Sequence, residues 1–158
     1  MLKFFERLQR KASPEKRPAR ETAAARTGTE GEEKAAALLL HMGWHILARN
    51  WRSGHLELDI VAQEGDTLVF VEVKTRAEDG MQRPYEALTP VKKQRLLRAA
   101  RAWLAEHDAW DSPCRFDLVC VKAKGGTYQT ELIRNVIEYT DLGTRNAVGG
   151  GNSSWQPW

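Results

Sequence analysis

The sequence predicts one α/β domain in which a mixed β-sheet is flanked by helices. Two segments have the composition and end signals of helices, and five have the two-residue alternation or apolar character of strands. The second helical segment separates the third strand from the fourth, an arrangement typical of a parallel crossover. The predicted order is therefore α-β-β-β-α-β-β.

The domain is expected to span residues 28–142. The chain has 158 residues, of which 42% are hydrophobic and 28% charged, which is the size and composition of one soluble domain. Residues 1–27 mix charges with prolines and bury too little apolar surface to offset chain entropy, so we expect a disordered basic arm. Residues 143–158 are rich in Gly, Ser and Trp and are expected to form a flexible tail.

The positive charge of the chain is concentrated in the arm. Residues 1–27 contain eight Lys and Arg against three Asp and Glu, whereas the rest contains 16 against 18. The net charge of +3 is therefore no evidence that the domain itself binds nucleic acid.

The sequence shows no apolar run long enough to span a bilayer and no secretory pattern, so we expect a cytoplasmic protein without integral membrane association. Cys114 and Cys120 lack metal-site spacing and are expected to be reduced thiols.

End signals define the two helices. Thr29 and Glu32 form a capping-box pattern that predicts the start of the first helix, and Gly43 marks its end. Thr89-Pro90 supplies an N-cap and a first-turn proline for a second helix over residues 91–106.

Three strands are predicted before the second helix and two after it. Their ranges are 44–51, 55–62, 67–76, 115–122 and 130–139.

Alternation assigns each residue of a strand to one of its two faces. One face of the third strand carries Leu68, Phe70, Glu72, Lys74 and Arg76, and the other carries Val69, Val71, Val73 and Thr75. One face of the second strand carries Leu56, Leu58 and Ile60, and the other carries Glu57, Asp59 and Val61.

The hairpin turn decides whether Asp59 meets Glu72. A two-residue loop, 65–66, places the two carboxylates directly opposite each other, and a four-residue loop, 63–66, places them diagonally. Both loops put the carboxylates on one face, whereas an odd loop without a bulge would separate them.

Two carboxylates this close favour a cation between them. They repel each other and are costly to desolvate unless a proton or a cation neutralises them. Mg²⁺ prefers one or two carboxylates with water and phosphate oxygens, and Lys74 could orient or deprotonate an attacking water. The alternative is that Glu72 and Lys74 form an ordinary solvated ion pair and that Asp59 begins a turn.

Six motifs follow one another along the chain: Gly28-x-x-x-Glu32-x-x-Ala35, Arg49-Asn50, Glu57-Leu58-Asp59, Phe70-Val71-Glu72-Val73-Lys74, Lys93-Gln94 and Arg115-Phe116-Asp117. Their order resembles the PD-(D/E)xK nuclease superfamily, and more closely the YraN-like bacterial family, which is similar to archaeal Holliday-junction resolvases. The resemblance covers roughly residues 28–140 and implies a restriction-endonuclease-like core. One departure is Leu56, which stands where the family tends to have Gly.

The resemblance also implies roles for individual residues. Asp59, Glu72 and the Val73 carbonyl would bind Mg²⁺ or Mn²⁺, and Lys74 would act on the water. Glu32 would bind metal through water or a second ion, although its capping role would compete for the same side chain. The implied activity is hydrolysis of phosphodiester bonds in DNA, branched or damaged DNA in particular, by a homodimer.

Basic side chains near this face are the expected phosphate contacts. They are Arg49, Arg52, Arg76, Lys93 and Arg95. Lys92 falls in a charged stripe of the second helix, and such stripes are commonly only solvated. Two alternatives remain open: a non-catalytic module that binds nucleic acid or recruits a partner while retaining the fold, and a membrane-associated adaptor that uses Phe4 and Phe5.

Overall fold

The computed structural model describes residues 23–76 and 88–137, with side chains described from residue 28 onward. Its elements are α2 (Ala23–His41), β1 (His45–Ser53), β2 (Leu56–Glu64), β3 (Thr67–Arg76), α3 (Pro90–His107), β4 (Cys114–Lys124) and β5 (Thr127–Ile133). The predicted order of helices and strands is confirmed. Most of the predicted arm, the whole predicted tail and the end of the last predicted strand lie outside the described residues.

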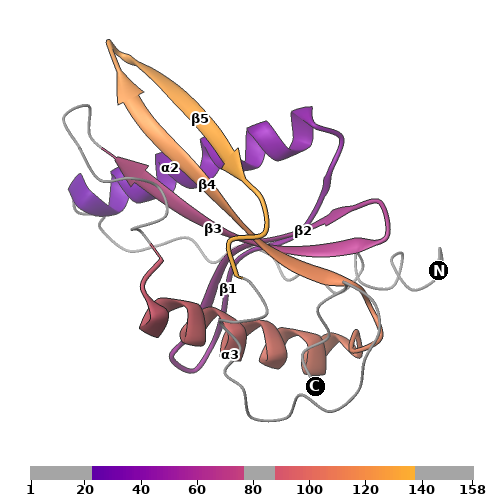
Figure 1. Cartoon of the computed structure of the whole chain (residues 1–158). Helices are drawn as coiled ribbons and strands as arrows, with labels where there is room; N and C mark the ends of the chain where they lie inside the picture. The colour runs from indigo at the N-terminus through magenta and orange to yellow at the C-terminus, as the bar shows by residue number, and fades with distance from the viewer. Residues whose placement is uncertain (1–22, 77–87, 138–158) are drawn as a thin grey trace.

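The strands form one mixed sheet in the order β1-β2-β3-β4-β5 (Figure 1). Strands β1, β2 and β3 make an antiparallel meander, β4 lies parallel to β3, and β5 returns antiparallel to β4. Helix α3 connects β3 to β4, because a parallel pair needs a crossover connection. The mixed sheet predicted from the position of the second helix is confirmed.

Helix α2 packs on one face of the sheet and α3 on the other (Figure 1). The α2 side buries Ala35, Leu39, Ile60, Val69, Val71, Val73, Val119 and Val121. The α3 side buries Leu58, Val61, Leu68, Phe70, Leu96, Leu97, Trp103, Leu104 and Phe116. Successive residues of β3 thus enter opposite layers, as alternation predicts, and both faces of β3 are covered.

Strand β2 does not alternate throughout. Leu58 and Val61 pack on the α3 side, whereas Ile60 packs on the α2 side, so the predicted placement of Leu58 and Ile60 on one face is wrong. The reversal falls at Asp59, across from Asn50 of β1, whose φ is +49°. A local irregularity of this kind increases the twist of a strand and changes the direction of a side chain, which here is that of Asp59.

The β2–β3 hairpin has the shorter of the two predicted turns. Glu64 pairs with Thr67, so the turn consists of Gly65 and Asp66. Gly65 has a φ of +57°, a conformation that glycine adopts without the steric cost of a side chain.

Strands β2 and β3 separate on the side of the hairpin away from this turn. Their register runs as far as the pair Ile60–Val71, whereas β3 stays paired with β4 up to Arg76. The predicted direct pairing of Asp59 with Glu72 across the ladder therefore does not occur. The two residues lie instead where the strands part, and this opens the sheet between them.

Helix α2 begins earlier than the sequence predicts. It starts at Ala23 and contains Thr29 in its interior, so the capping-box interpretation of Thr29 and Glu32 is wrong. The alanines that precede Thr29 are strong helix formers and extend the helix beyond the predicted cap. Glu32 is consequently an interior residue of the helix, and its side chain is not required as a cap.

Gly31 brings α2 close to the end of β3. A Cβ atom at this position would lie 1.8 Å from the Thr75 Oγ1 atom, so only glycine permits this approach. The close contact also fixes the next residue, Glu32, beside the end of β3.

A charge cluster around the buried Asp117 anchors the opposite end of the sheet. Asp117 is fully buried and accepts hydrogen bonds from Arg115 Nε at 3.0 Å and from the backbone N–H of Asn135 at 3.0 Å. Arg115 and Arg134 both donate to Glu64 Oε2 at 2.6 Å. These contacts join β2, β4 and the end of β5, so the matching motif Arg115-Phe116-Asp117 has a structural role here.

We expect Gly31→Ala to lower the free energy of unfolding by about 1–3 kcal/mol, because an added methyl group must push α2 away from Thr75. Thermal unfolding of both variants checks this. The matched control is Gly28→Ala in the same helix, where no atom lies within 4 Å of the added Cβ. Equal melting temperatures for the two variants would contradict the proposed close contact.

Candidate active site

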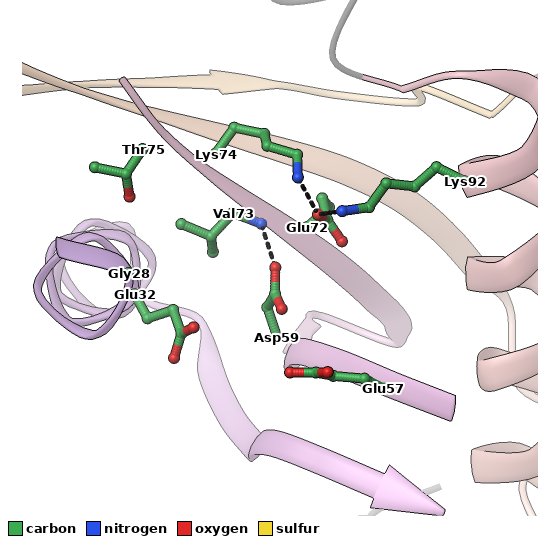
Figure 2. A pocket seen from close by; sticks show the side chains of 9 residues that line it. All are labelled: Gly28, Glu32, Glu57, Asp59, Glu72, Val73, Lys74, Thr75 and Lys92. Atoms are coloured by element: carbon green, nitrogen blue, oxygen red, sulfur yellow. Dashed lines mark hydrogen bonds and ion pairs between the residues drawn. The ribbon is translucent and has the colours of Figure 1, made fainter. Parts of the chain in front are cut away.

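A pocket of about 540 Å³ opens where β2 leaves β3, and residues of α2 and α3 also line it. Its lining residues are Gly28, Glu32, Glu57, Asp59, Glu72, Val73, Lys74, Thr75 and Lys92 (Figure 2). The predicted residues Asp59, Glu72, Val73, Lys74 and Glu32 therefore line one pocket. Glu57 and Lys92 join them from β2 and α3.

Asp59 takes the place of the strand pairing that β3 loses. Its Oδ2 atom accepts a hydrogen bond from the backbone N–H of Val73 at 2.8 Å (Figure 2). In an extended strand the N–H and C=O of one residue point to the same side, so the Val73 carbonyl also faces the pocket side of β3. The carboxylate thus satisfies a strand edge that would otherwise be unpaired.

Glu72 lies between two lysines. Its side chain is 6% exposed, and its Oε1 atom contacts Lys74 Nζ at 3.1 Å and also forms an ion pair with Lys92 Nζ. Lys74 comes from the same strand, whereas Lys92 comes from α3 (Figure 2). The buried carboxylate is therefore compensated by two ammonium groups, as a buried charge requires.

Lys92 is the functional candidate that sequence reasoning did not select. Thr89 is the N-cap of α3, and its side chain accepts a hydrogen bond from the Lys92 backbone N–H at 3.3 Å. This cap fixes Lys92 in the first turn, beside Glu72. The Thr89-Pro90 signal located that turn, but the rotation of α3 relative to the sheet depends on packing that no local pattern contains.

Glu32 projects from α2 toward the same pocket (Figure 2). Burial raises the pKa of Glu32 above its usual value, although a hydrogen bond with Asn50 and the charge of Arg49 lower it. The motif Arg49-Asn50 on β1 therefore holds this helix carboxylate in place.

The carboxylates of the pocket repel one another. Burial and the Glu72 carboxylate raise the pKa of Asp59 to about 7, although the Val73 N–H lowers it. Glu32 adds to the repulsion. A proton or a cation at Asp59 would relieve this unfavourable charge.

The two lysines differ in acidity. Burial and the nearby Lys92 ammonium lower the pKa of Lys74. Burial also acts to lower the pKa of Lys92, but its contacts with Glu72 outweigh burial and raise that pKa. Lys74 therefore loses a proton more readily than an ordinary lysine does, and Lys92 less readily.

The donor set fits a hard divalent ion. Asp59, Glu72 and the Val73 carbonyl present oxygen atoms, which are the ligands that Mg²⁺ and Mn²⁺ prefer. Among the described side chains, no three from Asp, Glu, His and Cys converge to bind one metal ion. Glu32 thus does not complete a three-carboxylate site, and water or phosphate oxygens would supply the remaining ligands, as is usual for Mg²⁺.

The predicted phosphate contacts are not all at the pocket. Arg52 pairs with Glu57 at 2.9 Å near the rim, and Arg95 lines a smaller adjoining pocket of about 100 Å³. Arg49 lies close enough to Glu32 to affect its pKa, and Arg76, which follows the pocket residue Thr75, lies close enough to Cys120 to affect the pKa of that thiol. Lys93 is half-buried and is absent from the lining of both pockets, which Lys92 enters in its place.

A family model described as "Uncharacterised protein family UPF0102" matches residues 31–121. The chain belongs to the UPF0102 family. Similar UPF0102 proteins include one from Nitratidesulfovibrio vulgaris, which is 57% identical over 132 residues, covering 84% of this chain and 95% of that protein. Another, from Lawsonia intracellularis, is 41% identical over 131 residues, covering 83% of this chain and 96% of that protein.

These comparisons confirm the resemblance to the YraN-like family that the motifs indicated. The names of the relatives state no activity, so they support the family of this UPF0102 protein and not its chemistry.

In the described part of the chain, α2 and α3 are not apolar enough over a sufficient length to cross a membrane. Cys114 and Cys120 are free thiols, as the sequence predicts.

The pKa of Asp59 predicts a pH effect on the stability of this UPF0102 protein. Between pH 3.8 and about 7 the folded protein holds a proton that the unfolded chain has lost, so the free energy of unfolding falls as pH rises through this window. We expect Asp59→Asn, which can still accept from Val73, to stabilise the fold at pH 8 by on the order of 2 kcal/mol and to have little effect at pH 4.

Thermal unfolding at the two pH values measures this difference. The control variant is Asp66→Asn in the exposed β2–β3 turn, and its effect on the melting temperature is the reference at each pH. An equal shift for Asp59→Asn would show that its carboxylate is not destabilised at high pH.

Proposed function

We propose that this UPF0102 protein is a metal-dependent nuclease that hydrolyses phosphodiester bonds in DNA. The observation that carries the proposal is the convergence of Asp59, Glu72 and Lys74 where β2 leaves β3. Asp59 and Glu72, with the Val73 carbonyl, would hold a Mg²⁺ or Mn²⁺ ion. Such an ion supplies a concentrated positive charge that stabilises phosphate oxygens and makes water more acidic.

Other residues of the pocket would position the attacking water and bind further water molecules. Lys74 projects beside Glu72 and has a lowered pKa, so it is suited to orient the attacking water and to take part in moving its proton. Glu32 lies across the pocket and could accept hydrogen bonds from further water molecules. The pocket is open to solvent on one side, which leaves room for a nucleic-acid backbone.

Arg52 and Arg95 are the predicted phosphate contacts best placed to guide a strand toward the pocket. Both are exposed, and Arg95 lines the smaller pocket that adjoins the main one. A preference for branched or damaged DNA and a homodimeric state are part of the proposal, and they rest on the resemblance to the YraN-like family. A cytoplasmic location, expected from the sequence alone, completes it.

One observation favours a second candidate function. Lys74 and Lys92 already neutralise Glu72 within the chain, as would suit a module that binds phosphate groups without cutting them. The two candidates make different predictions for the same experiment.

We expect the purified protein to cleave labelled DNA with Mg²⁺ or Mn²⁺ and to lose cleavage when a chelator is added. The substrates are single-stranded, duplex, flap and four-way-junction DNA. Glu72→Gln and Lys74→Met should reduce the cleavage rate by at least about 100-fold, because each removes a group that acts on the reacting atoms. Gel electrophoresis of the products measures the rate.

The matched controls remove the same charges elsewhere on the sheet. Glu131→Gln on β5 and Lys122→Met on β4 alter exposed residues outside the pocket and should cleave at the unchanged rate. Equal cleavage by all four variants would indicate a contaminant or a different site. DNA binding without cleavage by any form would favour the non-catalytic module.

A further inference from the structure

Lys92 forms an ion pair with one of the two carboxylates that would hold a metal ion. Its ammonium group pairs with Glu72 Oε1, the same oxygen atom that Lys74 contacts at 3.1 Å. Its charge also reaches Asp59, whose pKa it lowers. Lys92 therefore interacts with both carboxylates of the candidate metal site.

A divalent ion at Glu72 would be repelled by the ammonium groups of Lys74 and Lys92, which already neutralise this carboxylate. Glu72 is nearly fully buried, so charges beside it are poorly screened by water. Binding of an ion to Asp59 and Glu72 is thus favoured when one ammonium group moves away, and Lys92 is the more exposed of the two lysines.

The Lys92 side chain has free space beside it into which its ammonium group can move. Its side chain is 35% exposed, compared with 27% for Lys74, and it lines the adjoining smaller pocket together with Arg95. A lysine side chain is a flexible four-carbon stem, whereas its backbone here is fixed by the Thr89 cap. The ammonium group can therefore leave Glu72 while α3 stays in place.

We propose that Lys92 is an exchangeable counter-cation that couples metal binding to nucleic-acid binding, an inference that rests on the proposed nuclease function. Before substrate arrives, Lys92 neutralises Glu72 and weakens metal binding. A backbone phosphate draws Lys92 away from Glu72, and the freed carboxylate then binds the ion. Coupling of this kind is reciprocal, so the ion also releases Lys92 for phosphate.

Metal binding to the protein alone tests the first half of the coupling. We expect Lys92→Met to bind Mn²⁺ about tenfold more tightly than the unmodified chain in calorimetric titration, a typical size for such coupling. Lys92→Gln keeps a hydrogen-bond donor without the charge and should behave in the same way. The matched control is Arg101→Gln, which removes one exposed charge from the same helix away from both pockets and should change Mn²⁺ affinity less than twofold.

DNA binding in a chelator tests the second half without metal or cleavage. Glu72→Gln should strengthen binding of a short labelled duplex by about tenfold, because it frees the Lys92 ammonium for phosphate. The gain should disappear in the double variant Glu72→Gln/Lys92→Met and persist in Glu72→Gln/Arg101→Gln. Fluorescence anisotropy measures the affinities, and the double-mutant cycle isolates the contribution of the pair.

Three results would overturn the inference. If Lys92→Met and Lys92→Gln bind Mn²⁺ no more tightly than the unmodified chain, while Glu72→Gln abolishes binding, the coupling is wrong and the metal site stands. Additive effects of Glu72→Gln and Lys92→Met on DNA affinity would likewise exclude exchange of Lys92. If neither the unmodified chain nor any variant binds Mn²⁺, both the coupling and the proposed nuclease function fail.

Discussion

The site depends on the hydrogen bond by which Asp59 accepts from the Val73 backbone N–H. Strand β3 must stay paired with β4 on one edge while it loses β2 on the other. Strand backbone in the interior of a sheet cannot be left unpaired without a large cost. The Asp59 carboxylate satisfies this edge and allows two central strands to separate, which creates a polar pocket beside β3, a strand that is otherwise covered on both faces.

The same separation sets the electrostatics. It brings Asp59 and Glu72 together in a half-buried space, where burial of Asp59 first, and then repulsion by the Glu72 carboxylate, raise the pKa of Asp59 to about 7. Lys74 and Lys92 offset the charge of Glu72 from β3 and α3. Charge balance in the pocket thus depends on side chains that can move, and this is the basis for linking metal binding to phosphate binding.

The cluster around Asp117 shows what a purely structural arrangement looks like in this fold. Asp117 and Glu64 both accept hydrogen bonds from Arg115, and Glu64 also accepts from Arg134. The hydrogen bond from Arg134 is the main cause that lowers the pKa of Glu64 to about 2. The carboxylates there have fixed guanidinium partners, whose geometry suits them. At the pocket, Glu72 is paired with flexible ammonium groups and Asp59 retains unfavourable charge, so acidic residues within one domain serve different purposes.

The sequence by itself determined the order of the elements and the alternation of β3, and it indicated that Asp59 lies near Glu72 if the hairpin turn has an even number of residues. These follow from local patterns, since a two-residue turn fixes the register of a hairpin and alternation fixes the faces of a regular strand. Only the tertiary structure decided three features: the change of side-chain direction in β2 at Asp59, the position of Glu32 inside α2 and not at its cap, and the presence of Lys92 and not Lys93 in the pocket. Each of these depends on how strands diverge or how a helix is rotated against the sheet, and such geometry arises from contacts between residues far apart in the chain.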